Sequence, residues 1–295
     1  MSSWRARLDD VLWGPETGAR LLVVHSGLAA LIGLRIALGS YRQLADTPGP
    51  LFDPVPILAW APSMPSGWGF VGLQVVGTIA ALAAVARRNP RLAFGLAWLC
   101  YLVLAGLRGS RGKVLHNDLL LLWTSAPFLL APLSVTWQDR ERRRDHGWPV
   151  RSAMVIAALV YFLAGYHKIR RSGLDWAIGD NVRYVMLWGP SVGAAKWDAM
   201  ATWIGEHLWA AKATGAFILA VEISFPVVLV KRGLQPLYAL VAVALHVTTW
   251  LFLGLDYWAW ALTVLLIFVD WPALIDRRRA RSTSGAMRGS STRSG

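Results

Sequence analysis

A lysine stands where an apolar run ends, in the stretch YFLAGYHKIRRSGLDW, residues 161–176. A lysine acts as a base only while its amine is uncharged. Largely apolar residues precede Lys168 and cationic side chains follow it, with Arg171 on the same helical face, and both features favour the uncharged amine. The sequence therefore predicts that Lys168 is a catalytic base. The alternative is a structural lysine whose ammonium extends to the lipid headgroups.

Two neighbours of this lysine are candidates for binding a cofactor. His167 precedes it directly, and Trp176 lies at the start of a tryptophan-rich segment that reaches residue 210. Tryptophan side chains wall apolar ligand pockets, but they also anchor membrane proteins at the interface. We expect His167 and Trp176 to contact a cofactor and most other tryptophans of this segment to be interfacial anchors.

A polar triplet, His116, Asn117 and Asp118, lies where the chain is predicted to re-enter the membrane on the side of Lys168. A helix N-cap explains Asn117 or Asp118 but does not explain all three side chains. We therefore expect His116 and Asn117 to take part in catalysis beside the lysine, and Asp118 to contact the bound cofactor.

Arg35, Glu222 and His246 are three of the ionisable residues that lie inside predicted membrane spans. Such residues face the interior of a helix bundle and pair with one another. An unpaired Arg35 would cost several kcal/mol, so an acidic partner is expected, and Glu222 is the first candidate. A pair between Glu222 and His246 is the alternative. All three are predicted to be buried polar supports of the bundle.

Basic residues also occupy segments that are predicted to lie outside the membrane, where positive charge opposes insertion. They are Arg108, Arg111 and Lys113 in one short loop and Arg171 in the next. An anionic ligand, an acidic partner such as Asp118, or lipid headgroups would each explain them. We expect these four residues to attract an acidic substrate.

Composition places the chain in the membrane. Of 295 residues, 55% are hydrophobic and 16% are charged, with a mean hydropathy of +0.43, whereas a soluble domain carries about 25% charged residues. The net charge of +13 lies largely in loops and a tail, as positive-inside topology requires, so no nucleic-acid partner is expected. The predicted fold is an all-α, polytopic transmembrane helix bundle of about eight spans. These spans are 21–39, 68–86, 92–108, 114–135, 150–167, 211–230, 235–254 and 257–274.

Three segments follow from this pattern. Residues 1–20 are predicted to form an amphipathic segment on the membrane surface, 21–274 the transmembrane domain, and 275–295 a disordered basic tail. Placing both termini in the cytoplasm puts most Lys and Arg residues on the inner side of the membrane, so Lys168 is predicted to face the outer side. We expect this membrane to be a prokaryotic plasma membrane. For the segment 186–210, a re-entrant helix and an additional helix are both open alternatives.

Several common site types are missing from the sequence. A single cysteine, Cys100, excludes an intramolecular disulfide and any cysteine-based metal cluster. The six histidines show no HxxxH spacing, and neither a GxSxG motif, a Walker-type phosphate loop nor a dinucleotide glycine pattern occurs. We expect no metal.

Four stretches together resemble a known family. YFLAGYHKI followed by DWAIGDNVRY resembles the YF-x-AG-x-x-K-(I/L)…W-x-x-G signature of vitamin K-dependent γ-glutamyl carboxylase and of the wider horizontally transferred transmembrane (HTTM) domain group. LRIALGSYRQL, KVLHNDLLLLWTSAPFLLAP and EISFPVVLVKRGLQPLYALVAVALHVTTWLF resemble other parts of the same membrane core, over roughly residues 20–272.

This resemblance implies an enzyme that uses a reduced isoprenoid quinone of the vitamin K or menaquinol type, with O₂ and CO₂ as co-reactants. In the carboxylase, a lysine at the place of Lys168 deprotonates the quinol; oxygenation then yields an epoxide and a strong base, which permits carboxylation of glutamate. His116 or Asn117 matches the Asn-His pair that assists near the quinone.

The sequence departs from the family at two points. His167–Lys168 replaces two adjacent lysines, and the carboxylase's large extracytoplasmic domain is not part of this sequence, so only the membrane chemistry is carried over. The expected partners are the bilayer, the quinone, and a secreted peptide or small acidic substrate. The alternative functions are a non-enzymatic membrane factor for export or maturation of a secreted peptide, and a small-molecule transporter.

Overall fold

The computed structural model is mainly helical, and it describes residues 2–111 and 116–290. Within these ranges there are two short strands, which pair with each other in antiparallel orientation. The elements in chain order are α1 (Ser2–Trp13), β1 (Glu16–Thr17), α2 (Gly18–Leu38), η1 (Arg42–Asp46), η2 (Gly49–Leu51), η3 (Pro56–Leu58), α3 (Gly67–Val85), α4 (Pro90–Gly109), α5 (Leu119–Ser125), η4 (Ala126–Leu130), β2 (Arg142–Arg143), α6 (Arg144–Ser172), α7 (Asp175–Ile178), α8 (Asn181–Ser191), α9 (Asp198–Glu206), α10 (Leu208–Ser224), α11 (Val227–Val230), η5 (Arg232–Leu234), α12 (Gln235–Leu253), α13 (Trp258–Phe268) and α14 (Trp271–Ser290).

The protein is embedded in a membrane. In the described part of the chain, α2, α3, α4, α6 and α12 are long and apolar enough to cross a bilayer, and α13 with α14 adds a sixth span if the bent pair counts as one. The structure does not confirm eight spans. The predicted span 114–135 has only the short apolar helix Leu119–Leu130 in its described part, and the predicted span 211–230 is divided into α10 and α11.

Local sequence explains where these helices begin and break. The Thr17 hydroxyl accepts a hydrogen bond from the Arg20 amide (3.1 Å) and caps α2. Pro226 separates α10 from α11, because proline lacks the amide proton that a continuous helix needs. The turn between α13 and α14 bends the chain by 61° just before Pro272. The segment left open at 186–210 contains the end of α8, the short helix α9 and the start of α10.

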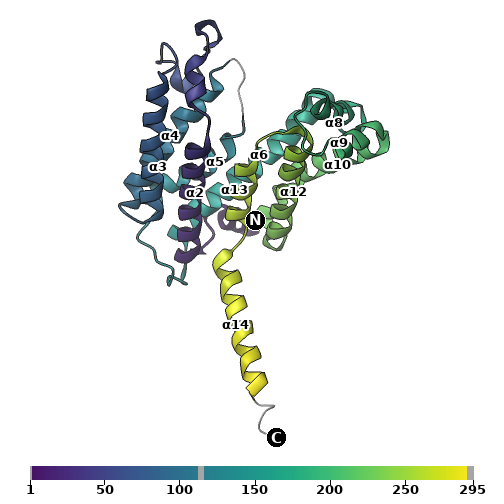
Figure 1. The fold of residues 1–295 in the computed structure, drawn as a ribbon. Coiled ribbons are helices and arrows are strands. Elements are labelled where there is room, and N and C mark those ends of the chain that lie inside the picture. The colour runs from purple at the N-terminus through teal and green to yellow at the C-terminus, as the bar shows by residue number, and fades with distance from the viewer. Residues whose placement is uncertain (1, 112–115, 291–295) are drawn as a thin grey trace.

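The bundle has two unequal hydrophobic cores. Figure 1 shows α3 and α4 on one side of the molecule and α8, α9 and α10 on the other, with α6, α12 and α13 between them. The larger core joins α2, α3, α4, α5, α6 and α13. A smaller core lies under α8 and α9, around Val182, Met186 and Ala211, and reaches Phe252 at the end of α12. The two cores flank the region in which Lys168 lies.

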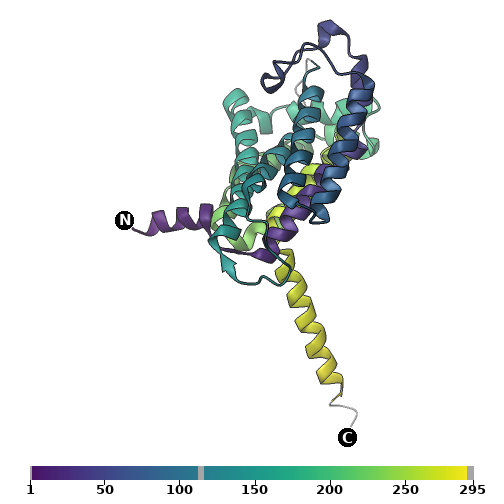
Figure 2. The same ribbon diagram turned by 90° about the vertical axis from the view of Figure 1, so that its left-hand side faces the viewer.

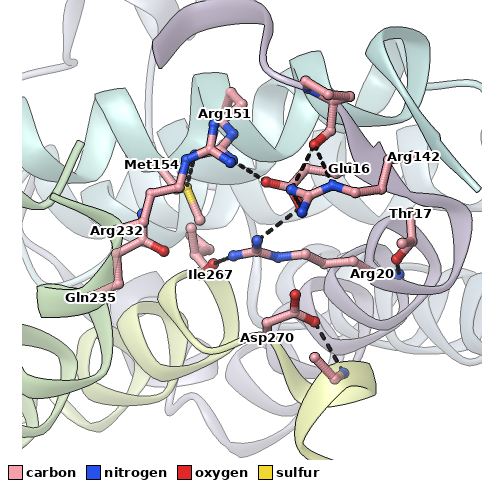
Figure 3. A network of polar contacts seen from close by, with 12 residues as sticks. Glu16, Thr17, Arg20, Arg142, Arg151, Met154, Arg232, Gln235, Ile267 and Asp270 are labelled. Carbon is pink, nitrogen blue, oxygen red and sulfur yellow. Dashed lines mark hydrogen bonds and ion pairs between the residues drawn. The ribbon is translucent and has the colours of Figure 1, made fainter. Parts of the chain in front are cut away.

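A buried carboxylate ties the beginnings of α2 and α6 together. Glu16, which is 1% exposed, contacts Arg20 (3.0 Å), Arg142 (3.5 Å) and Arg151. Figure 3 shows Glu16 surrounded by these arginines, with the Arg20 guanidinium also directed toward the Ile267 carbonyl at the end of α13 (3.1 Å). Three distant parts of the chain therefore meet at one end of the bundle.

The first and last helices leave the bundle at this same end (Figure 2). Asp9 of α1 pairs with Arg144 (2.8 Å), and Asp276 of α14 pairs with Arg140 (3.0 Å). The segment 275–295, predicted as a disordered basic tail, overlaps α14, which is helical to Ser290. Alanine and arginine favour helix, which explains this result; residues 291–295 lie outside the described part. Which end faces the cytoplasm stays a prediction from the distribution of Lys and Arg.

Candidate functional site

A cavity of about 830 Å³ lies between α6, α8, α10 and α12. Most of its lining is aliphatic or aromatic, with Phe217 and Phe252 among the larger side chains. Six side chains in its wall can gain or lose a proton: Lys168, Glu222, Tyr161, His246, Tyr257 and His116. The cavity therefore combines an apolar interior with a few polar groups, as ligand sites do.

Lys168 contacts Glu222 in the wall of this cavity. The lysine ammonium donates hydrogen bonds to both carboxylate oxygens, at 2.6 Å for Oε2, and the two side chains are 24% and 12% exposed. Gly165 permits this contact, because a Cβ at that position would lie 2.9 Å from the Cβ of Glu222. The ammonium also lies 4.8 Å from the centre of the Trp176 ring.

The surroundings of Lys168 differ from those predicted. The sequence suggested that Arg171 and its cationic neighbours favour the uncharged amine, but Arg170 and Arg171 are exposed. The group that contacts the amine is the Glu222 carboxylate. The helix α10 supplies this carboxylate, and its approach to α6 could not be read from the residues next to Lys168.

Two tyrosine–histidine pairs form another part of the wall. The hydroxyl of Tyr161 and Nε2 of His246 share a hydrogen bond at 2.6 Å, and the hydroxyl of Tyr257 and Nε2 of His116 share one at 2.5 Å. The rings of His246 and Tyr257 stack with centres 5.5 Å apart. Burial raises the pKa of Tyr257 to about 12, so this hydroxyl keeps its proton at neutral pH.

Arg35 has two acidic partners, and Glu222 is not one of them. Its guanidinium contacts Asp118 (2.7 Å) and Asp256 (2.5 Å). Asp118 also accepts hydrogen bonds from Arg108 (3.1 Å) and from the Tyr101 hydroxyl (2.9 Å). The predicted Arg35–Glu222 pair is therefore wrong, because Arg35 lies at the end of α2 that meets the start of α5.

A second, polar pocket of about 390 Å³ adjoins this ion-pair network, and its wall includes Arg35, Arg108 and Arg111. Neighbouring residues of one segment face different spaces: His116 lines the large cavity, whereas Asn117 lines the polar pocket. Asn117 donates a hydrogen bond to the backbone carbonyl of Asp256 (2.9 Å). Asn117 thus supports the wall between the two spaces and does not reach the lysine's side of the cavity.

The structure brings together some of the predicted site residues and not others. His116, Lys168, Trp176, Glu222 and His246 line the large cavity. Asp118 is buried in the ion-pair network and is not part of the cavity wall, and His167 and Arg171 are exposed and also lie outside the wall. Lys113 lies outside the described residues. Within the described ranges, no three His, Cys, Asp or Glu side chains gather as metal ligands would.

Tyr161, Tyr257 and Asp256 were not predicted as site residues. Tyr161 begins the motif that contains Lys168, two helical turns before the lysine, so its position on the same helix was available from the sequence. Asp256 and Tyr257 stand in the short turn between α12 and α13. An acidic residue beside an aromatic one at a span end is a weak signal, because interfacial anchors have the same composition.

Comparison with known proteins finds no family model, no curated protein and no solved structure that matches this chain. The resemblance to the carboxylase therefore depends on the motifs quoted above. The functional argument that follows depends on those motifs and on the geometry of the cavity.

Proposed function

We propose that this protein is an integral membrane enzyme that binds a reduced isoprenoid quinone and takes a proton from its ring hydroxyl at Lys168. The observation that carries the proposal is the Lys168–Glu222 pair in the wall of a largely apolar cavity. A lysine whose role is to reach the headgroups would not turn its ammonium toward a carboxylate of the neighbouring helix α10.

The cavity suits such a ligand in size and in chemistry. Its volume of about 830 Å³ falls within the range of roughly 300–1,000 Å³ that small-molecule sites occupy. Its aliphatic walls match an isoprenoid chain, and Trp176, Trp260 and Phe252 provide aromatic surface for a ring. Tyr161 and His246 offer a hydrogen-bonding pair to a ring oxygen.

The Lys168–Glu222 pair supplies a base without a net charge in the apolar site. Burial disfavours the separated charges, so the proton that Nζ shares with Glu222 can move to the carboxylate. The uncharged amine then accepts the hydroxyl proton of the ligand, and Glu222 keeps the proton it received. Lys168 becomes an ammonium again, which stabilises the negative charge that develops beside it.

The bound quinol would supply the reducing power for a reaction with O₂, and the family resemblance adds CO₂ as the second co-reactant. The acceptor is an acidic small molecule or a secreted peptide. Arg111 in the wall of the polar pocket is the candidate for attracting it, on the side of the membrane that the charge distribution predicts to be the outer one.

The test is ligand retention. Protein purified in mild detergent from a menaquinone-containing membrane is extracted and analysed by mass spectrometry, with reduced menaquinone added to a parallel sample in phosphatidylcholine nanodiscs. We expect about one quinone per protein. Ala164→Phe, which fills the cavity, should remove it, whereas Leu163→Phe on the exposed face of α6 should not.

Two results would contradict the proposal: wild-type protein that retains and binds no quinone, or equal retention by the Ala164→Phe variant. Quinone-free protein that instead accumulates a solute in sealed vesicles would indicate a transporter.

A further inference from the structure

The cavity has a wall in which two helices contact each other at one end only. Among the described residues, α10 packs on α6 and on α7, α8 and α9, while α12 packs on α13, α8 and α9. Helices α10 and α12 both line the cavity, and they meet at the end of α10, where the hydroxyls of Ser224 and Tyr238 share a hydrogen bond at 2.8 Å, but they make few other contacts with each other. The cavity is therefore closed by α6 behind and by α8 at one end, and is not closed along the rest of the boundary between α10 and α12.

Side chains at this gap belong to the cavity and to the outer surface at the same time. Phe217 of α10 lines the cavity and is 52% exposed. Ala213 of α10 and Ala244 of α12 also line the cavity and are exposed. The surface beside the gap is apolar, with Leu240 and Val247 exposed on α12. A surface of this kind on a membrane-embedded bundle faces lipid chains.

The two threonine hydroxyls that α12 contributes to the cavity do not make the gap polar. Thr248 and Thr249 line the cavity on α12, but both hydroxyls donate to the carbonyl of Leu245, at 2.9 and 2.7 Å. The two threonines therefore present their methyl groups to a ligand. By contrast, two of the three polar pairs in the cavity wall include a residue of α6, Lys168 in one and Tyr161 in the other.

From this arrangement we infer that the gap between α10 and α12 is a lateral opening through which an isoprenoid chain passes from the bilayer into the cavity. The inference rests on the proposed function, because it names the part of the quinol that the gap holds. The ring lies against α6, which contributes to two of the three polar pairs, and the chain extends between α10 and α12 into the lipid. Only a molecule that is polar at one end and has a long apolar chain at the other matches both sides of the cavity.

The experiment compares two ligands in phosphatidylcholine nanodiscs. One is reduced menaquinone, and the other is 2-methyl-1,4-naphthoquinol, which has the same ring without the chain. Ala213→Trp narrows the opening, and Ala216→Trp is the matched control, because Ala216 is exposed on the same helix but does not line the cavity. We expect Ala213→Trp to weaken binding of the chain-bearing quinol about tenfold or more, equivalent to about 1.4 kcal/mol, and to leave binding of the bare ring within about twofold.

A spin label gives a readout that does not require quinol binding. A nitroxide on Phe217→Cys, with the buried Cys100 replaced by alanine, should collide with O₂, which concentrates in the bilayer, more than with a water-soluble nickel complex. Reduced menaquinone should lower the collision rate with O₂ at position 217 and leave a label at position 216 unchanged.

Equal binding of both quinols by Ala213→Trp and wild type would overturn the lateral opening while leaving the proposed function intact. Preferential collision of the label at position 217 with the nickel complex would overturn it as well, because the gap would then face water. If wild-type protein binds neither quinol, the proposed function fails, and the label still decides whether the gap opens to lipid.

Discussion

Lys168 of α6 and Glu222 of α10 are 54 positions apart in the sequence, and their side chains meet in the wall of the large cavity. The contact depends on Gly165, because a Cβ at that position would lie 2.9 Å from the Cβ of Glu222. The pair places a titratable amine and its proton acceptor together, which is the arrangement that base catalysis in an apolar site requires.

Removing the carboxylate should change the pH dependence of the reaction. In Glu222→Gln, the lysine has no neighbour that accepts its proton, so the uncharged amine forms only by releasing that proton to water. We expect quinol-dependent turnover to fall about tenfold or more at pH 7 and to recover as the pH rises. Initial rates between pH 6 and 10 test this, and a variant with the wild-type pH profile would contradict it.

Separating α6 from α10 should weaken the site without removing any of its polar groups. Gly165→Leu places a side chain where even a Cβ would lie 2.9 Å from Glu222. We expect quinol binding to weaken about tenfold, roughly 1.4 kcal/mol, as measured by titration in nanodiscs. Gly72→Ala on α3 is the control, because a Cβ there meets nothing within 4 Å. Unchanged binding in Gly165→Leu would show that the contact is not needed.

The ion pairs of Arg35 should matter for stability. Asp118→Asn leaves a buried guanidinium with only one of its two carboxylates. Breaking a buried ion pair in this way lowers the free energy of unfolding by about 3–5 kcal/mol. We expect the thermal midpoint in detergent to fall by about 10 °C. Asp276→Asn removes the partly exposed pair with Arg140 and should change it by no more than a few degrees. Similar midpoints for the two variants would contradict this account.

Alkaline pH should reveal the burial of Tyr257. Its pKa in the folded protein is about 12, raised from 10 by burial, so the unfolded chain loses this proton first as the pH rises. Stability is therefore unaffected well below pH 10 and is lost progressively as the pH rises from about 10 to 12, by about 1.4 kcal/mol at pH 11. Tyr257→Phe should lose correspondingly less stability between pH 9 and 11, measured by thermal unfolding. An identical loss in both proteins would argue against the burial.

The long apolar helices could be predicted from the sequence. The expected span 21–39 and the observed helix Gly18–Leu38 differ by a few residues at the start, where the Thr17 cap fixes the boundary. Hydropathy alone did not predict where helices break: Pro226 divides one expected span into α10 and α11, and a 61° bend separates α13 from α14. Breaks of this kind depend on how each half packs against its neighbours.

The site was predicted in part. The position of Lys168 at the end of an apolar run identified the lysine, and hydropathy identified Glu222 as a buried acid. Their pairing was not predicted, because Glu222 was expected to pair with Arg35, whose partners in the structure are Asp118 and Asp256. Which of several buried charges pair is decided by helix positions, and a single sequence does not contain those positions.

The central claim is that Lys168 accepts a proton from a bound quinol, and quinol-dependent oxygen consumption tests it most directly. Wild type, Lys168→Met and Lys196→Met, a control for loss of one exposed lysine outside the cavity, are compared in nanodiscs at saturating reduced menaquinone with quinol binding measured in parallel. The account predicts that Lys168→Met still binds quinol but consumes oxygen at least about 100-fold more slowly than wild type, while Lys196→Met matches wild type. Oxygen consumption by Lys168→Met at the wild-type rate would contradict it.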